Sequence, residues 1–266
     1  MKIRLERLTI TILFVLLLLT LVYYEKTLNC HYSNECNKST QKLPSALIIG
    51  AAKCGTGTLL EFISVHPNVV GDCYKEVHYF NLDKNFKKGT EWYRRQLPFS
   101  NENQITIEKT PYYLTDNNSS RRVYQMNPKM KIIIIVCDPV VRAVSYYLQM
   151  KVNGEFGMRG FFSSNDSEFF RKLLYTDSKN NTIISNVQSH KLFKHGFYYT
   201  HIVEWLKYFP LEQLFFINGE RFKKEPFEEI KKLEKFLELE PFVKREHFVY
   251  EKTRIFLSKK IVNVSR

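Results

Sequence analysis

The sequence has few prolines, glycines and cysteines, and it has fewer acidic than basic residues. Nine prolines and ten glycines among 266 residues, together with 15% aromatic residues, exclude a collagen-like chain, wholesale disorder and a protein of many membrane spans. Five cysteines are too few for a disulfide-built scaffold, and they are too scattered for a zinc cluster. The length suits a globular protein, and one compact domain is sufficient.

Positive charge is what the chain has in excess. Forty lysine and arginine residues stand against twenty-seven aspartate and glutamate residues, which gives a net charge of +13. A basic excess of this size favours a polyanionic partner. Composition alone leaves nucleic acid, anionic lipid and sulfated glycan as alternatives.

An uncharged stretch, mostly Leu, Ile, Val and Phe, runs from Leu8 to Tyr24, at the lower limit of length for a membrane-spanning helix. Basic residues precede it, so the positive-inside rule places the N-terminus in the cytoplasm. We therefore expect a cytoplasmic tail at 1–7, a type II signal anchor at 8–24, a stem at 25–42 and a luminal domain at 43–266. A signal peptide cleaved near Cys30 is the alternative, and it also leads to the secretory pathway.

Asparagine glycosylation sequons agree with a luminal domain, although such triplets also arise by chance. They begin at Asn37, Asn117, Asn118, Asn165, Asn180 and Asn263. A luminal position weakens the nucleic-acid alternative and strengthens the glycan one.

Short apolar runs alternate with helical patterns, which predicts an α/β fold with a parallel sheet covered by helices. Strands are expected at 46–50, 104–108, 131–136 and 213–217. Helices are expected from Thr56, after Pro139, over 189–209 and over 226–239. Tyr198 and Tyr199 are expected to pack in the core. The sequence has no internal repeat, so one domain is the simplest partition.

A glycine-rich segment follows the first of these strands, and it reads Gly50-Ala-Ala-Lys-Cys-Gly-Thr-Gly-Thr58. A turn of this kind between a strand and a helix presents backbone N–H groups to a phosphate. A Walker A loop requires lysine directly after its last glycine, whereas Lys53 lies inside this loop. The pattern argues against an ATPase and for another phosphorylated donor. A kinase-like enzyme and a turn that binds nothing are the alternatives.

A second loop follows the strand at 131–136. Cys137, Asp138 and Pro139 precede a helix that carries Arg142 and Ser145 in its first two turns. In a parallel sheet both loops lie at the carboxyl ends of the strands, where α/β proteins bind nucleotides. Taken alone, the segment is equally compatible with an aspartate that caps a helix beside a solvated arginine.

The two loops together resemble those of the sulfotransferase superfamily, which bind the 5′-phosphosulfate and the 3′-phosphate of 3′-phosphoadenosine 5′-phosphosulfate (PAPS). Further segments are similar to the heparan sulfate glucosamine 3-O-sulfotransferases, in the order 75–80, 89–93, 97–100, 107–113, 205–210, 218–222 and 252–254. The resemblance extends from about Leu43 to Phe256. It implies a single P-loop-like sulfotransferase domain with a central parallel sheet flanked by helices. The transmembrane helix expected at 8–24 precedes this domain.

The resemblance also implies roles for individual residues. Glu76 is the general base that takes the proton of the glucosamine 3-hydroxyl, and His78 orients the acceptor or tunes Glu76. Lys53 neutralises charge on the leaving oxygen, and Lys109 holds the sulfate oxygens. The further donor-binding positions are Cys54, Gly55, Thr56, Gly57, Thr58, Cys137, Arg142 and Ser145, and the further acceptor-binding positions are Lys75 and Gln149.

The expected reaction uses PAPS as co-substrate and no metal, and it takes place at the Golgi membrane. The expected partner is heparan sulfate, and nucleic acid is excluded. We further expect the apolar side chains of Val77, Tyr79 and Phe80 to desolvate Glu76 and thereby raise its basicity.

Several positions depart from the family pattern. Cys137 stands where the family has an arginine that binds the 3′-phosphate, and Asn81 replaces an acidic residue near the acceptor. Ala52 and Gly57 replace basic residues of the first loop. Two alternatives therefore stay open, a catalytically weakened or inactive heparan-binding homologue and a sulfotransferase for another glycan.

Overall fold

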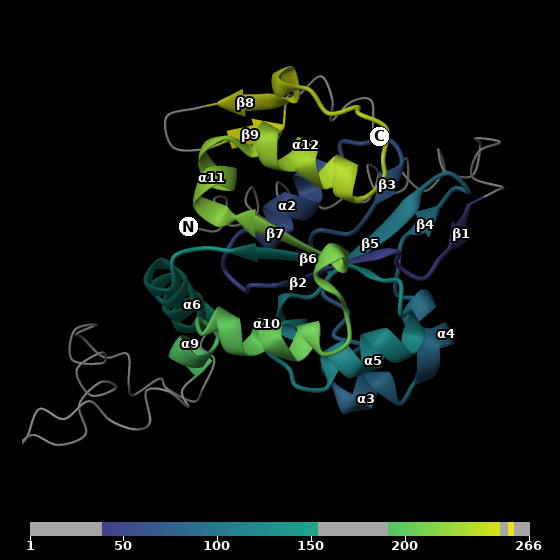
Figure 1. The fold of residues 1–266 in the computed structure, drawn as a ribbon, viewed down its shortest axis with the longest axis vertical. Coiled ribbons are helices and arrows are strands. Elements are labelled where there is room, and N and C mark those ends of the chain that lie inside the picture. The colour runs from purple at the N-terminus through teal and green to yellow at the C-terminus, as the bar shows by residue number, and fades with distance from the viewer. Residues whose placement is uncertain (1–38, 154–190, 251–254, 258–266) are drawn as a thin grey trace, which may run out of the picture.

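The computed structural model describes residues 39–153, 191–250 and 255–257 (Figure 1). A five-stranded parallel sheet in the order β3-β5-β2-β6-β7 forms the centre of these residues. Its strands are β2 (Ala46–Gly50), β3 (Val69–Val70), β5 (Ile105–Lys109), β6 (Lys131–Val136) and β7 (Leu214–Asn218). Two antiparallel pairs lie outside it, β1 (Thr40–Gln41) with β4 (Phe99–Ser100) and β8 (Phe248–Tyr250) with β9 (Ile255–Leu257).

The two central strands explain why the sheet forms. Every residue of β2 is buried, and Ile132 to Ile135 of β6 are fully shielded from solvent. Parallel strands that are covered on both faces are continuous apolar runs, and this is the pattern of both segments. The predicted strands are confirmed, with shifts of one residue at β5 and β7.

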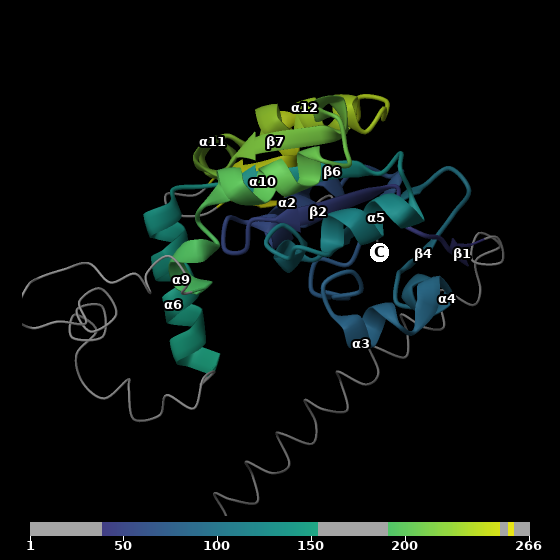
Figure 2. The same cartoon turned by 60° about the horizontal axis from the view of Figure 1, so that its bottom comes forward.

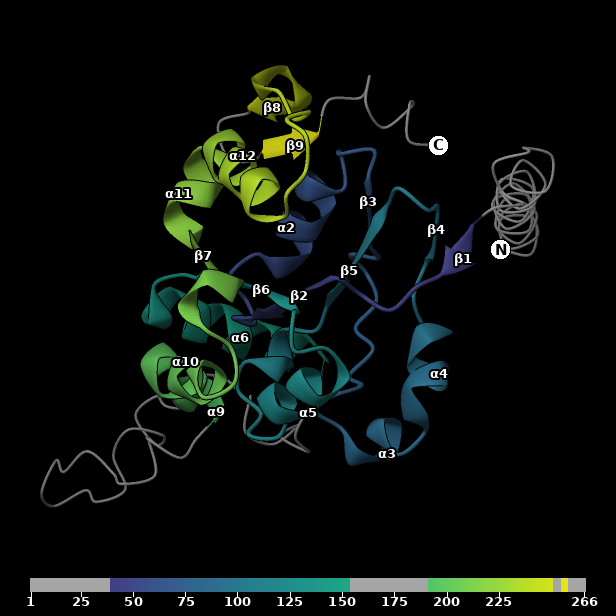
Figure 3. The same cartoon turned by 45° about the vertical axis from the view of Figure 1, so that its right-hand side comes forward.

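Helices cover both faces of the sheet, with α2, α11 and α12 on one side and α5, α6 and α10 on the other (Figures 1 and 3). The longer helices are α2 (Thr56–Ile63), α5 (Ser119–Met126), α6 (Pro139–Asn153), α10 (Tyr198–Leu206) and α12 (Pro226–Phe236). The shorter ones are α3 (Asp83–Phe86), α4 (Gly89–Arg94), η2 (Pro111–Tyr113), α9 (Lys191–Lys194), η4 (Leu211–Gln213), α11 (Gly219–Lys224) and η5 (Arg245–His247). Figure 2 shows α6 running away from the sheet with α9 beside it. The predicted α/β class with a helix-covered parallel sheet is confirmed.

The single helix expected over 189–209 is wrong. A turn at Gly196 separates α9 from α10, and the Gly196 N–H donates to the Phe193 carbonyl at 2.7 Å. A side chain at Gly196 would meet the Pro139 ring at 3.1 Å, so the turn packs closely against the start of α6. The expected core position of Tyr199 is also wrong, because the side chain is 79% exposed after the turn resets the helix face.

Within the described residues, no helix is long and apolar enough to cross a membrane. The predicted anchor at 8–24, most of the stem with Cys30 and Cys36, and the sequons at Asn37, Asn165, Asn180 and Asn263 lie outside those residues. Their expected roles stay predictions.

Candidate active site

The site lies where three neighbouring parallel strands end. In the order β5-β2-β6, Lys109 is the last residue of β5, the glycine-rich loop follows Gly50 of β2, and Cys137 follows β6. Register pairs Ile48 with Lys109 and Gly50 with Ile134, so β5 ends two residues before β2, and β2 ends two residues before β6. The sheet therefore places the two predicted loops side by side and puts Lys109 on the flank of the first.

The glycine-rich loop, residues 51–55, ends in a helix N-terminus that suits an anion. Gly55 adopts φ 98°, and within the described residues no side chain caps α2. The first intrahelical bond runs from the Leu59 N–H to the Gly55 carbonyl at 2.9 Å, so the N–H groups of residues 56–58 precede it. Free N–H groups at a helix N-terminus suit a phosphate, and phosphate binding at this loop stays a prediction. Thr56 is buried and Thr58 is exposed, so their hydroxyls do not share one surface.

Lys53 links this loop to α6. Its backbone is left-handed, with φ 77°, and its Nζ donates to Gln149 Oε1 at 2.8 Å. Ser145 is one helical turn before Gln149 and therefore lies on the same face of α6. The structure thus brings together Lys53, Ser145 and Gln149, which come from the two loop regions.

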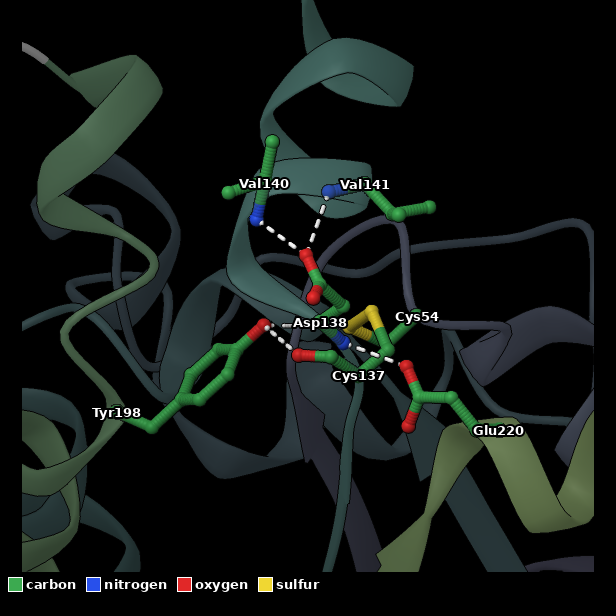
Figure 4. Close-up of a disulfide and its surroundings, with 7 residues drawn as sticks. All are labelled: Cys54, Cys137, Asp138, Val140, Val141, Tyr198 and Glu220. Atoms are coloured by element: carbon green, nitrogen blue, oxygen red, sulfur yellow. Dashed lines mark hydrogen bonds between the residues drawn. A yellow bond between two sulfur atoms is a disulfide. The ribbon is translucent and has the colours of Figure 1, made fainter.

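A disulfide between Cys54 and Cys137 joins the two loops directly (Figure 4). The sequence pattern does not predict this bond, and it marks Cys137 only as a departure from the family's arginine. The positions of the two cysteines could have indicated the bond, because Cys54 closely follows β2 and Cys137 directly follows β6, and these two strands are paired. The Cα atoms are 5.4 Å apart, within the normal range for a disulfide.

Arg142 does not face the glycine-rich loop, so the expectation that Arg142 binds the donor is corrected. Its side chain is fully buried, its Nη2 donates to the Leu192 carbonyl, and Gly196 packs against its Nε. Among the described residues, its Nε and Nη1 have no hydrogen-bond partner. Asp138 does cap α6, because its Oδ1 accepts the N–H groups of Val140 at 2.8 Å and Val141 at 3.0 Å.

A cluster of charged side chains lies on the β5 flank of the loop. Lys109 Nζ donates to Glu76 Oε1 at 2.9 Å, and His78 Nε2 lies 3.5 Å from Glu76 Oε2. The Lys109 side chain is 6% exposed, whereas that of Glu76 is 31% exposed. The structure brings Glu76, His78 and Lys109 together, and solvent reaches the carboxylate and the imidazole, whose side chains are 31% and 28% exposed. Their expected catalytic roles stay predictions.

The expectation that apolar neighbours raise the basicity of Glu76 is wrong. Burial alone raises the pKa of Glu76, but hydrogen bonds from His78 and Lys109 outweigh it, so the pKa is lowered from 4.5. The hydrogen bond to Glu76 raises the pKa of His78 above 6.5, against the opposing effect of burial. Val77, Tyr79 and Phe80 turn into the protein core.

A buried polar network behind the cluster was not foreseen. The Glu108 carboxylate accepts hydrogen bonds from the hydroxyls of Thr110 at 2.5 Å and Tyr93 at 3.1 Å, and burial raises the pKa of Glu108. The Thr110 hydroxyl in turn accepts the His78 N–H at 3.4 Å. His78 has φ 53°, and Asn81 Oδ1 lies 3.3 Å from its Nδ1. The network fixes the backbone and the ring of His78.

Lys75 is not part of this cluster. Its Nζ donates to the Gln96 carbonyl at 2.8 Å, at the end of α4. In the part of the chain that the structure describes, no three His, Cys, Asp or Glu side chains gather as a metal site. The expectation that the reaction needs no metal stays a prediction.

Comparison with known proteins agrees with this geometry. The sulfotransferase domain family matches residues 43–265. Heparan sulfate glucosamine 3-O-sulfotransferase 5 of Mus musculus is 39% identical over 216 residues, which cover 81% of this chain and 59% of that protein. Heparan sulfate glucosamine 3-O-sulfotransferase 3A1 of Homo sapiens is 36% identical over 222 residues, which cover 83% of this chain and 50% of that protein. The chain thus spans little more than half the length of these relatives.

The fold has a solved counterpart as well. The crystal structure of a sulfotransferase from Alicyclobacillus acidocaldarius superposes with a TM-score of 0.61 at 22% identity, covering 84% of this chain and 90% of that one. At this identity the likeness shows the fold alone. The family match spans both loops and the Glu76 cluster, and it covers most of the sequence. The chain therefore belongs to the sulfotransferase domain family.

Proposed function

We propose that the chain transfers a sulfuryl group from PAPS to the 3-hydroxyl of glucosamine residues in heparan sulfate. One observation carries the proposal: the cluster of Glu76, His78 and Lys109 lies at the end of β5, next to the glycine-rich loop at the end of the adjacent strand β2. A proton acceptor and an anion site must lie side by side for transfer to a hydroxyl. The 3-O position follows from the names of the relatives and from the segments that resemble them.

The donor loop fits the phosphosulfate end of PAPS, because it offers Lys53 and the N-terminus of α2. Helix α6, which follows β6, offers the Ser145 hydroxyl for the 3′-phosphate, and Cys137 between them forms a disulfide where the family has arginine. PAPS supplies the sulfuryl group and a phosphate leaving group. Lys53 lies at the loop and stabilises negative charge on the leaving oxygen.

Glu76 accepts the proton of the acceptor hydroxyl. His78 and Lys109 keep its carboxylate ionised at neutral pH, and both are held by the β5 side of the site. The lowered pKa makes Glu76 a weak base, so the rate gain comes mainly from position and charge stabilisation. Lys109 Nζ is 2.9 Å from Glu76 Oε1, and its proposed role is to stabilise charge on the sulfate oxygens of the transferred group.

The heparan sulfate chain is the proposed polyanionic partner, consistent with the net charge of +13. We place the protein in the Golgi membrane as a glycosylated single-pass type II protein, with residues 43–266 in the lumen. Support for this location comes from the apolar stretch at 8–24, the basic residues before it and the sequons.

One observation favours a second candidate function. Cys137 is in a disulfide and Arg142 is buried, so neither of these described residues supplies the cation that the family uses at the end of β6. This favours a catalytically weakened or inactive protein that retains heparan binding.

A transfer assay separates the candidates. Purified full-length protein is incubated with PAPS labelled in the sulfuryl group and with heparan sulfate or chondroitin sulfate. Label at the glucosamine 3-oxygen of heparan sulfate supports the proposal, and Glu76→Gln is the matched inactive control. Label in chondroitin sulfate alone indicates another glycan acceptor. Heparin binding with neither transfer nor PAPS-dependent binding establishes the second candidate.

A further inference from the structure

The Cys54–Cys137 disulfide connects two segments whose other links are non-covalent. One end is in the glycine-rich loop after β2, the other directly follows β6, and 83 positions of sequence separate them. The adjoining strands are neighbours in the sheet, and the Ala51 N–H donates to the Ile135 carbonyl at 2.7 Å. The bond therefore crosses the carboxyl edge of the sheet (Figure 4), and Cys54 lies two residues before the start of α2.

At the loop end of the disulfide, the Ala51 N–H bond to β6 holds the start of the loop, and the described hydrogen bonds of Lys53 and Cys54 are within the loop, exposed or long. Lys53 and Gly55, on either side of Cys54, both have left-handed backbones, and lysine adopts that conformation reluctantly. The Cys54 N–H donates to the Ala51 carbonyl at 3.1 Å, a bond within the loop itself. The Lys53 to Gln149 hydrogen bond is exposed, and a long flexible side chain makes it. The disulfide is the strongest constraint on residues 51–55.

The other end is in a rigid frame. The Tyr198 hydroxyl of α10 donates to the Cys137 carbonyl at 3.0 Å and lies 3.5 Å from Cys54 Sγ. The Asp138 N–H donates to Glu220 of α11 at 2.6 Å (Figure 4). A Cβ on Gly219 would lie 3.0 Å from Cys137 Cβ, so the start of α11 packs directly on Cys137. Two helices, α10 and α11, and the preceding strand β6 thus hold Cys137.

We propose that the Cys54–Cys137 disulfide positions the glycine-rich loop by holding it against β6, α10 and α11. The affinity for the donor then depends on whether the two cysteines are oxidised to the disulfide. The inference rests on the proposed use of a PAPS-type donor at this loop. A dithiol reductant delivers two electrons and two protons, the S–S bond breaks, two thiols form on the protein, and the dithiol leaves as its own disulfide. The loop then samples other conformations, and the donor must reorder it on binding.

The test measures the affinity of PAP, the desulfated form of PAPS, by calorimetry on oxidised protein, dithiol-reduced protein and the Cys54→Ala/Cys137→Ala variant. We expect about tenfold weaker binding in the last two, and an affinity in the variant that reductant does not change. In turnover assays the donor KM rises, while the acceptor KM and the kcat at saturating donor stay constant. Cys73→Ala is the matched control, because Cys73 is an unpaired, half-buried cysteine among the described residues, and it retains the response to reductant.

Equal PAP affinity in oxidised, reduced and variant protein overturns the inference. Hydrogen exchange at the shortest labelling times tests it without any donor. Loss of protection at residues 54–58, with β2 and β6 still protected, supports it. An unchanged loop, or loss of protection in the sheet to the same degree, contradicts it. Oxidised protein that fails to bind PAP refutes the proposed function instead, and the exchange measurement still decides the role of the disulfide.

Discussion

Removal of the Cys54–Cys137 disulfide gives a stability change whose size follows from the structure. A cross-link lowers the entropy of the unfolded chain in proportion to the logarithm of the loop that it closes. For a separation of 83 residues, the chain-entropy relation gives about 4.5 kcal/mol at room temperature. This is a large share of the roughly 5–15 kcal/mol by which a domain is usually stable.

The measurement is urea unfolding of oxidised wild type against Cys54→Ala/Cys137→Ala, followed by circular dichroism. Alanine is chosen because Cys54 is 8% exposed and a hydroxyl there would add a buried polar group. The free energy of unfolding is expected to fall by about 4–5 kcal/mol, and the m-value to rise because the unfolded chain expands. Cys73→Ala is expected to change the free energy of unfolding by about 1 kcal/mol or less.

A loss of less than about 1 kcal/mol in the double variant refutes this reasoning, because no loop of this length can be closed at so small an entropy difference. A Cys73→Ala loss that equals that of the double variant refutes it as well. In that case the loss in free energy of unfolding comes from removing buried sulfur atoms and not from removing the cross-link.

The charged cluster and Arg142 give further predictions. Glu76→Gln lowers kcat about 10²- to 10⁴-fold and leaves PAP affinity unchanged, and comparable turnover contradicts its role as base. In an NMR titration, the pKa of His78 is expected to lie above 6.5 in the wild type and to fall in Glu76→Gln. The contribution of the His78–Glu76 pair to the free energy of unfolding is complete below pH 6.5, and it is lost as the pH rises through the raised pKa of His78. Arg142→Met leaves PAP affinity in calorimetry unchanged because the side chain faces α9, and a clear loss of affinity restores Arg142 to the donor site.

Local pattern was sufficient for the elements that form the sheet. The isoleucine run of β6 and the apolar run of β2 are buried on both faces, and short continuous apolar runs are typical of such buried parallel strands. The relation between Glu76 and His78 was also local, because they are two positions apart on one segment. The helix break at Gly196 was not visible, because the close approach to Pro139 that requires glycine depends on tertiary packing.

What the sequence did not reveal depends on pairs of segments far apart in the chain. The disulfide requires the register of β2 on β6, which brings Cys54 beside Cys137. The burial of Arg142 depends on how α9 returns to α6. The lowered pKa of Glu76 depends on Lys109, which is 33 positions away and on a different element. The apolar residues around Glu76 predicted that desolvation would raise its pKa, but the hydrogen bonds from His78 and Lys109 lower the pKa by more.

The central claim is that the glycine-rich loop and α6 bind one donor molecule between them. Calorimetric titration of the oxidised protein with PAP tests it most directly, with Lys53→Ala measured in parallel. We predict one saturable site per chain, weakened about tenfold to a hundredfold in Lys53→Ala because a charge-assisted contact is lost. Absence of saturable binding, or equal affinity in the variant, contradicts the claim.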